Sequence, residues 1–322
     1  MVDVIADANI DHIFLQVYAN GETIYPSDIL RTNLRFSRGQ DPLSRVIRRA
    51  DSYGIKVHAW FNVFYIWGYS PTPADPTHPL KGNWAVCDRQ GRSIKDYTPV
   101  QLKNLGIEGY YVSPFNPSYQ NLILSLIDEV ITKYDVDGIH LDYIRFPSLT
   151  FGYDPWARTV FARRYYLDPL TSQNLNEIID QENQYQIHMR YREVLSDGLT
   201  EFIRRITESV HKRKPIKVSA AVKPDPHEAR TRYGQDWLKW LTTGSIDFVI
   251  TMSYTSNTNW ILKTIGRLKP RDRIWIGIGT YLQDRRSITN QISTLRRHGY
   301  EDLVIFSFED LRKRRWLPSC WQ

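Results

Sequence analysis

Residues 134–148 read YDVDGIHLDYIRFPS, and this stretch combines the pattern of a buried strand with an embedded carboxylate. The run GIHLDYIRF at 138–146 is rich in β-branched and aromatic residues, and Pro147 ends it. Because side chains alternate between the two faces of a strand, His140 and Asp142 lie on the same face. A charged carboxylate on a buried strand is costly unless it is paired, hydrated or used chemically. The stretch therefore predicts a strand that carries a functional acid near its C-terminal end.

The same run belongs to a long alternation of strand-like and helix-like segments. Asn116 and Pro117 begin a helical pattern that continues to residue 134, with apolar residues at three- and four-residue steps. No G-x-G-x-x-G or P-loop pattern follows a strand, which disfavours a nucleotide-binding doubly wound sheet. We therefore predict an α/β fold with a parallel sheet, a (β/α)8 TIM-type barrel. The other expected strands cover residues 12–19, 55–63, 216–222, 247–254, 273–280 and 303–308.

Two connections in this barrel are too long for ordinary turns. Residues 64–115 and 147–189 are rich in Pro, Gly, Tyr and Trp, and we interpret both as insertions. No linker or repeat divides the chain, so we expect a single elaborated barrel domain over residues 1–322. Seven strands are one fewer than a (β/α)8 barrel needs.

The overall composition disfavours several classes of protein. With 322 residues, of which 42% are hydrophobic and 24% charged, the chain has the balance of a globular protein with an ample core. No apolar run reaches the roughly 18 residues of a membrane span, and the N-terminus lacks the pattern of a secretion signal. The formal charge of +7 is spread along the chain without interleaved aromatic residues, so we do not expect a nucleic-acid partner. Cys87 and Cys320 form neither a disulfide framework nor a C-x-x-C pair.

A metal-dependent hydrolase is one alternative that these residues leave open. His58, His140, Asp142 and His227 could meet in a barrel, but none of them shows H-x-H or H-E-x-x-H spacing. We therefore expect no metal ion and no cofactor.

Polar and aromatic side chains recur at alternate positions of several expected strands. Active sites of (β/α)8 barrels lie at the C-terminal ends of the strands, whereas the barrel core is otherwise apolar. Two structural alternatives remain: Asp142 could pair with Arg145, and His58 and His140 are more often hydrogen-bonded core residues than bases. The candidate substrate-binding residues are Gln16, Tyr18, His58, Trp60, Asn62, His140, Arg145 and Tyr254.

The segment VDGIHLDYIRFP at 136–147 resembles the strand-4 signature of the glycosyl-hydrolase-like family ten, barrel proteins of mainly bacterial origin linked to glycan hydrolysis. FLQVYANGETIYPSD, VHAWFNV, GYYVSPFNPSYQNLI, FGYDPWARTVFARRY, QDWLKWLTTGSIDFVITMSYT and FSFEDL are also similar to family patterns, so the likeness runs from about residue 10 to 312. Family members normally begin with an Arg-Gly-Val-Trp-like first strand, which this chain does not show. The resemblance thus implies a TIM-type barrel lacking the usual first strand, either truncated or completed by residues 110–113. It also implies an extracytoplasmic location, although this chain carries no signal peptide.

The resemblance further implies a glycosidase that acts on a polymeric glycan, such as bacterial cell-wall or related polysaccharide. Glycoside hydrolysis generally needs two carboxyl groups, and Asp142 matches the family's strand-4 aspartate. Glu309 and Asp225 are candidates for the second, although Glu309 could instead cap a helix and Asp225 could order a turn. We expect Trp60 and Tyr254 to contact the sugar, and His140 to position Asp142 or contact a hydroxyl group. The alternative function is a non-catalytic carbohydrate-binding protein on a degenerate barrel.

Overall fold

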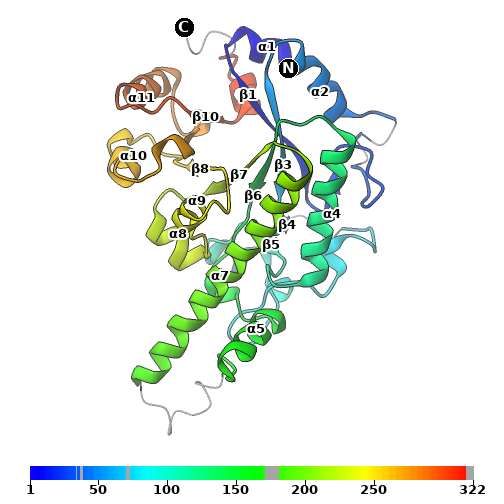
Figure 1. Cartoon of the computed structure of the whole chain (residues 1–322), viewed down its shortest axis with the longest axis vertical. Coiled ribbons are helices and arrows are strands. Elements are labelled where there is room, and N and C mark those ends of the chain that lie inside the picture. Colours follow the sequence, from blue (N-terminus) through cyan, green and yellow to red (C-terminus); the bar gives the residue numbers. More distant parts are fainter. Residues whose placement is uncertain (34, 37–38, 70–72, 171–180, 317–322) are drawn as a thin grey trace.

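A computed structural model describes the chain except for residues 34, 37–38, 70–72, 171–180 and 317–322 (Figure 1). An eight-stranded sheet with the order β10-β9-β8-β7-β6-β3-β1-β2 forms its centre. All neighbouring pairs from β10 to β1 are parallel, which confirms the predicted α/β class and the seven predicted strands. These strands are β1 (His12–Ala19), β3 (Lys56–Asn62), β6 (Gly138–Asp142), β7 (Lys217–Val222), β8 (Phe248–Met252), β9 (Ile274–Gly279) and β10 (Leu303–Phe306).

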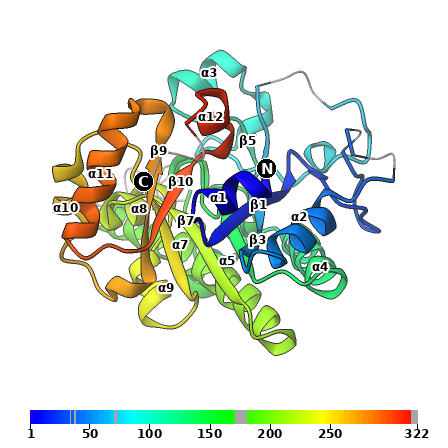
Figure 2. The ribbon, with the colours of Figure 1, turned by 90° about the horizontal axis from the view of Figure 1, so that it is seen from above.

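Helices lie along the outer side of this sheet, as the alternation of strand and helix requires (Figures 1 and 2). The N-terminus of α4 illustrates why the sequence begins a helix at this point. The Asn116 side chain accepts a hydrogen bond from the Tyr119 N–H, and Pro117 occupies the first turn. The α-helices are α1 (Val2–Asp7), α2 (Pro42–Asp51), α3 (Pro99–Asn104), α4 (Pro117–Lys133), α5 (Pro155–Tyr165), α7 (Gln181–Arg213), α8 (Pro226–Tyr233), α9 (Trp237–Thr242), α10 (Thr258–Ile265), α11 (Arg285–Arg297) and α12 (Phe308–Lys313). Short 3-10 turns are η1 (Pro79–Lys81), η2 (Ile94–Asp96), η3 (Leu149–Phe151), η4 (Arg271–Arg273) and η5 (Thr280–Leu282).

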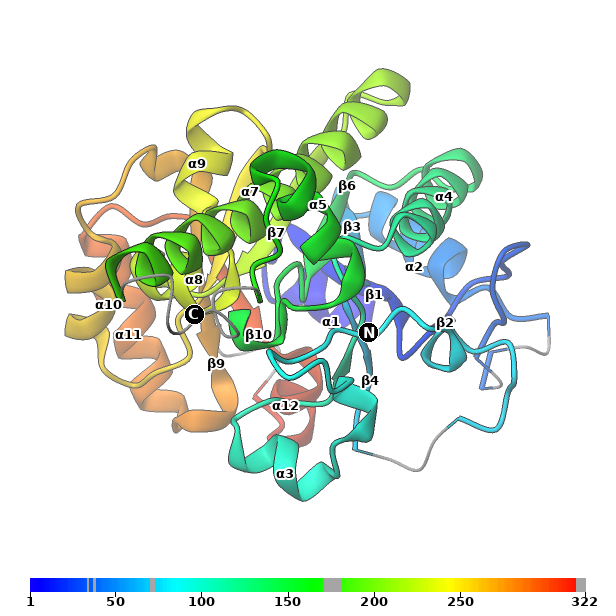
Figure 3. The same ribbon diagram turned by 90° about the horizontal axis from the view of Figure 1, so that it is seen from below.

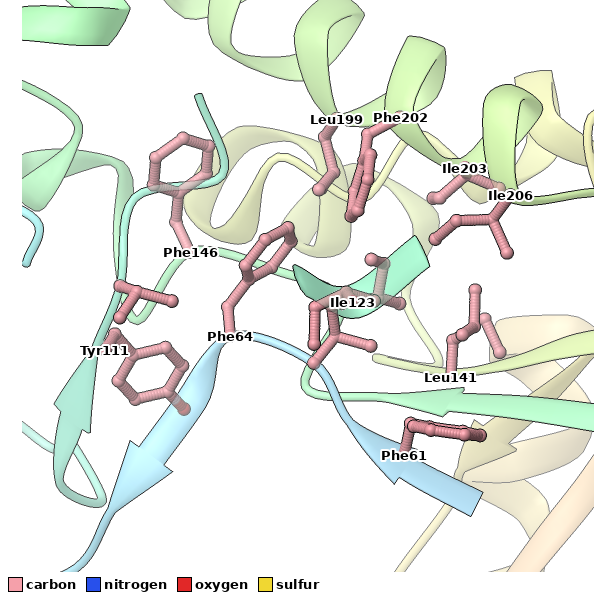
Figure 4. Close-up of a cluster of buried hydrophobic side chains, with 14 of the residues drawn as sticks. Phe61, Phe64, Tyr111, Ile123, Leu141, Phe146, Leu199, Phe202, Ile203 and Ile206 are labelled. Atoms are coloured by element: carbon pink, nitrogen blue, oxygen red, sulfur yellow. The ribbon is translucent and has the colours of Figure 1, made fainter. Parts of the chain in front are cut away.

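The main hydrophobic core lies between the sheet and the helices α4 and α7 (Figure 4). Phe61 and Leu141 come from the sheet, and they face Ile123 of α4 and Phe202 of α7, all four essentially without solvent exposure. Burying an apolar side chain of this size contributes roughly 1.5–3 kcal/mol, so this layer fixes the strands that carry the site. Among the described residues, no helix is long and apolar enough to cross a membrane.

The first insertion, which carries α3 (Figure 3), also forms a small second sheet, whose two strands are labelled in Figure 1. In it, β4 (Tyr65–Trp67) pairs antiparallel with β5 (Tyr110–Tyr111). The expectation that 110–113 might complete the barrel is therefore wrong, because the backbone of β5 is hydrogen-bonded to β4 and not to the main sheet. The short β2 (Glu22–Thr23) joins only the last two residues of β1.

The main sheet is an open, TIM-type half-barrel. Its parallel array ends at β1 on one side and at β10 on the other, and no pairing joins these two strands within the described part of the chain. The prediction of a TIM-type barrel lacking one strand is confirmed.

Candidate active site

A cavity of about 990 Å³ opens at the C-terminal ends of the central strands and continues between β1 and β10. Asp142 of β6, Lys223 after β7 and Tyr254 after β8 line its upper part, together with Glu108 from the first insertion. This is the rim where (β/α)8 barrels carry their catalytic groups.

Asp142 is held at this rim by an abrupt change in the backbone. Tyr143 adopts the left-handed conformation with φ of 51°, which a non-glycine residue rarely does, and this ends β6. The Tyr143 N–H donates to Asp142 Oδ1 at 2.6 Å, and the Val63 N–H donates to the Asp142 carbonyl oxygen at 2.8 Å. Burial raises the pKa of Asp142 to about 6, and the Glu108 charge adds to this rise against the opposing effects of the Tyr143 N–H and Arg145. Asp142 is therefore suited to hold a proton in mildly acidic solution.

Glu108 is the second carboxylate of the cavity, and it is stabilised in the ionised state. It accepts hydrogen bonds from Arg145 Nη2 at 2.9 Å and from the Tyr111 hydroxyl at 3.1 Å. Burial acts to raise the pKa of Glu108, but the charge of Arg145, a hydrogen bond from the backbone N–H of Glu108, the hydrogen bond from Arg145 and the charge of Lys223 outweigh it, so the pKa lies below its ordinary value. Two carboxyl groups of one cavity thus have pKa values shifted in opposite directions, which is the arrangement that separates an acid from a base.

Arg145 is hydrogen-bonded to Glu108 and lies among aromatic rings. It is only 2% exposed, and its guanidinium carbon lies 4.9 Å from the ring centre of Tyr143 and 5.3 Å from that of Tyr233. Its Nε and Nη1 atoms find no hydrogen-bond partner among the described residues. Lys223 also lies near this Tyr233 ring, with Nζ 5.0 Å from the ring centre, and burial together with Arg145 lowers the pKa of Lys223. Both cations increase the positive potential around the carboxylates.

Aromatic rings form one wall of the cavity. Tyr254 stacks on Phe306 with ring centres 5.4 Å apart and planes 15° apart, and Trp60 meets Phe306 edge-on at 6.2 Å. Trp60 also contacts the ring of His140 at 6.1 Å. Flat apolar surfaces next to hydrogen-bonding groups are the usual features of a small-molecule site.

Comparison with known proteins decides the family. A model of the family described as Glycosyl hydrolase-like 10 matches residues 1–272. The chain belongs to this family. The resemblance predicted from VDGIHLDYIRFP is thereby confirmed.

Two curated relatives carry related names. The chain is 27% identical over 139 residues to glycosyl hydrolase DigH of Escherichia coli (strain K12), a match that covers 41% of this chain and 30% of that protein. It is 21% identical over 278 residues to glycosyl hydrolase YngK of Bacillus subtilis (strain 168), covering 80% of this chain and 48% of that protein. The match therefore spans less than half the length of each of these relatives.

Solved glycosidase structures share the fold. The α-L-fucosidase isoenzyme 2 from Paenibacillus thiaminolyticus superposes with a TM-score of 0.61 at 18% identity, covering 94% of this chain and 41% of that chain. The catalytic domain of β-amylase from Paenibacillus polymyxa gives a TM-score of 0.57 at 11% identity, covering 96% of this chain and 88% of that chain. At these identities the similarity establishes the TIM-type architecture alone.

Within this glycosyl hydrolase-like 10 fold, four of the eight residues expected to bind substrate line the cavity: Trp60, His140, Arg145 and Tyr254. His140 is nearly buried, and its Nδ1 lies 2.9 Å from Ser219 Oγ. Burial lowers the pKa of His140 to about 3, so the ring is neutral. Its hydrogen bond thus runs to the neighbouring strand β7, while its ring supports Trp60.

The other four expected substrate-binding residues do not line the cavity. The Gln16 side-chain amide donates to the Asn62 side-chain oxygen at 3.2 Å, so these two side chains pair with each other. His58 lies near the N-terminal ends of the strands, where its Nε2 is 3.0 Å from His12 Nδ1. Tyr18 lies beyond an irregularity in the pairing of β1, and its hydroxyl contacts the Tyr119 hydroxyl at 3.2 Å.

The two expected second carboxylates also lie outside the cavity lining. Glu309 is exposed in the first turn of α12, where Arg312 Nη2 lies 2.9 Å from its Oε1. Asp225 caps α8 by accepting a hydrogen bond from the Glu228 N–H at 2.9 Å. Asp225 thus orders the turn before α8, as the alternative reading of the sequence has it, whereas the N-cap of α12 is Ser307 and Glu309 instead pairs with Arg312. Glu108 was not among the predicted residues, because it follows α3 in an insertion and not a barrel strand.

Of the four possible metal ligands named from the sequence, His140 and Asp142 line the cavity, whereas His58 and His227 do not. His58 is buried low in the barrel, His227 is exposed on α8, and His140 bonds to Ser219. In the described part of the chain, no three His, Cys, Asp or Glu side chains gather as a metal site would require.

Proposed function

We propose that this protein is a glycoside hydrolase in which Asp142 is the general acid and Glu108 supplies the second carboxylate. The observation that carries the proposal is the presence of both groups in one cavity with oppositely shifted pKa values. Glycosidic bonds are cleaved through an oxocarbenium-like transition state, which needs a proton for the leaving oxygen and negative charge near the anomeric carbon. Asp142, with its pKa raised to about 6, donates the proton to the glycosidic oxygen. Glu108, kept ionised by Arg145, either attacks the anomeric carbon or activates water.

Arg145 acts on the reaction through Glu108 and not on the sugar itself. It is nearly buried, and its hydrogen bond fixes one Glu108 oxygen, while the Tyr111 hydroxyl donates to the other. A carboxylate held by two donors keeps its orientation and its charge when substrate displaces water from the cavity.

The proposed substrate class is a polymeric glycan of the bacterial cell wall or a related polysaccharide. Trp60 and Tyr254 offer ring faces for sugar rings on the wall beside Asp142. Both curated relatives are named glycosyl hydrolases, which supports the reaction class. The cavity is open at the strand ends, where a long chain can lie across the rim.

A glycan panel tests this proposal. Wild-type protein and Asp142→Asn are incubated with peptidoglycan glycan strands, chitin oligosaccharides and plant polysaccharides, and products are followed by reducing-end assay and mass spectrometry. We expect new reducing ends with wild type on at least one glycan, and a loss of about 10²–10⁴-fold with Asp142→Asn. Glu208→Gln, an exposed change on α7, is the matched control and keeps full turnover. Glycan binding without product formation by wild type on the whole panel would instead favour a non-catalytic carbohydrate-binding protein.

A further inference from the structure

Tyr281 is an exposed aromatic residue that the proposed chemistry does not use. It lies in η5 directly after β9, on the rim where the strands end, and it lines the cavity. Tyr281 is 47% exposed, and its neighbour Leu282 is 49% exposed. Single exposed apolar residues are common on protein surfaces, so this exposure alone indicates no function. Tyr281 differs from Leu282 because Tyr281 lines the cavity and Leu282 does not.

The Tyr281 ring continues the aromatic wall formed by Tyr254 and Phe306. Its centre lies 6.2 Å from that of Tyr254 and 6.4 Å from that of Phe306, and the ring planes meet at 72° and 83°. The Tyr281 ring is therefore nearly perpendicular to the two stacked rings beside it. Because a flat sugar face stacks on one of two such surfaces at a time, Tyr281 offers a second stacking position next to that of Tyr254.

Gly279, the last residue of β9, makes the close approach of the two tyrosines possible. A Cβ atom at this position would lie 3.1 Å from Tyr254 Cβ and 3.1 Å from Tyr281 Cε1. Both contacts are tighter than ordinary van der Waals contact, so a larger residue would push the tyrosines apart. The strand thus ends in the residue type that this arrangement of rings needs.

The turn that carries Tyr281 is held in place by hydrogen bonds from two sides. Arg314, which follows α12, donates from Nη2 to the Tyr281 carbonyl oxygen at 3.2 Å and from Nη1 to the Gln283 carbonyl oxygen at 3.0 Å. The Thr280 hydroxyl donates to the Phe306 carbonyl oxygen at 3.1 Å. A binding surface that is ordered before the ligand arrives loses less conformational entropy on binding. The anchored turn therefore favours binding by the exposed ring.

Tyr254 connects this turn with the candidate acid. Burial raises the pKa of Tyr254, and the charges of Asp142 and Tyr281 raise it further, so Tyr254 lies near both residues. A glycan that places its scissile linkage at Asp142 can therefore extend past Tyr254 and reach Tyr281 at the edge of the cavity.

We propose that Tyr281 forms an outer sugar-binding subsite, where its ring stacks on the sugar unit that follows the unit beside Tyr254. The proposal rests on the glycan chemistry proposed for the cavity, and it adds a preference for chain length. Oligosaccharides that reach from Asp142 to Tyr281 bind more tightly than disaccharides, because they cover one more aromatic face. The stacking needs the ring and not the hydroxyl group, so phenylalanine can replace tyrosine at this position.

Binding of oligosaccharides of increasing length tests the subsite without turnover. In the Asp142→Asn background, calorimetric titration measures the affinity for series from disaccharide to hexasaccharide, prepared from peptidoglycan glycan strands, chitin and plant polysaccharides. We expect one step in a series at which an added unit raises affinity about 10-fold. Tyr281→Ala removes this step and leaves the disaccharide affinity unchanged, which also shows that the variant is folded. Tyr281→Phe and the matched control Leu282→Ala both keep the step.

Three results would overturn the subsite. They are the absence of a step in every series, a step of equal size in Tyr281→Ala, and an equal loss of the step in Leu282→Ala. Failure of the subsite and failure of the proposed hydrolysis give different outcomes. A step that depends on Tyr281, without any product from the wild type, supports the subsite and contradicts hydrolysis. Equal product release by wild type and Tyr281→Ala from every chain length supports hydrolysis and contradicts the subsite.

Discussion

The Arg145 guanidinium donates to the Glu108 carboxylate at 2.9 Å within the cavity that also contains Asp142. This contact joins a residue just after β6 to a residue of the first insertion, 37 positions apart in sequence. It places a fixed negative charge beside a carboxyl group whose pKa is raised to about 6. Burial raises the pKa of Asp142, whereas the buried Arg145 is the largest cause of the lowered pKa of Glu108.

The pH dependence of turnover follows from the two shifts. Asp142 must be protonated and Glu108 ionised, so kcat/KM is expected to fall as pH rises through about 6. On the acid side, kcat/KM falls only when Glu108 becomes protonated. This protonation occurs below the ordinary pKa of a glutamate because Arg145 stabilises the charged form of Glu108. A pH–rate profile of the wild type measures both limbs. A profile that rises steadily from pH 5 to 9 would contradict the role of Asp142 as acid.

The stability advantage of Asp142→Asn over the wild type is expected to grow as pH rises. The folded-state pKa of Asp142 is raised to about 6. The free energy of unfolding of the wild type therefore falls as pH rises from about 4 through 6, because the folded protein must then carry a buried charge. Asparagine keeps the acceptor for the Tyr143 N–H without this penalty. The variant should be more stable than wild type by about 1–3 kcal/mol at pH 8 and similar at pH 4. Chemical denaturation at the two pH values measures the difference, and equal stability at both would show that Asp142 is not desolvated.

Replacing Arg145 is expected to raise the pKa of Glu108. Arg145→Met removes the charge that lowers the pKa of Glu108, so the acid limb of the pH profile is expected to move upward. Arg145→Lys should restore part of this shift but not the geometry of the hydrogen bond. Arg158→Met, which removes a partly exposed partner of Asp168, is the matched control and leaves the acid limb in place. If the acid limb of the pH–rate profile does not move in Arg145→Met, Glu108 is not the group whose protonation stops the reaction.

Trp60 is expected to act on substrate binding. Trp60→Ala removes a ring face of the cavity wall, and we expect KM for a glycan to rise about 10-fold, with a smaller change in kcat. Trp60→Phe should retain most of the affinity because it keeps an aromatic face. Trp260→Ala on α10 is the control, since this ring is 41% exposed and does not line the cavity. Steady-state kinetics compares the three variants, and unchanged KM in Trp60→Ala would remove this residue from the site.

Much of the architecture was predictable because each strand carries its own local signal. Seven apolar, β-branched runs alternate with helical periodicity, and all seven form parallel strands. Asp142 was predictable as a residue of the cavity for the same reason, because alternation and the following Pro147 place it at the end of a buried strand. Its catalytic role stays a prediction.

The rest of the site could not be predicted because strand alternation gives the face of a residue but not its depth. His58 shares a face with Trp60, yet it lies two residues lower and bonds to His12. At β1 the alternation itself fails, since the pairing irregularity between Gln16 and Tyr18 turns Tyr18 toward α4. Glu108 lies in an insertion and lines the cavity. Its position depends on the pairing of β4 with β5, and no periodic pattern in the sequence predicts that pairing.

The most direct measurement of the central claim is azide rescue of carboxylate-deleted variants on a glycan that the wild type cleaves. Glu108→Ala should lose about 10²–10⁴-fold in turnover, and azide should restore part of it with formation of a glycosyl azide, because the small anion replaces the missing carboxylate. Glu309→Ala and Asp225→Ala should keep turnover and give no such product. Undiminished turnover in Glu108→Ala, or azide rescue confined to either of the other two variants, would contradict the account.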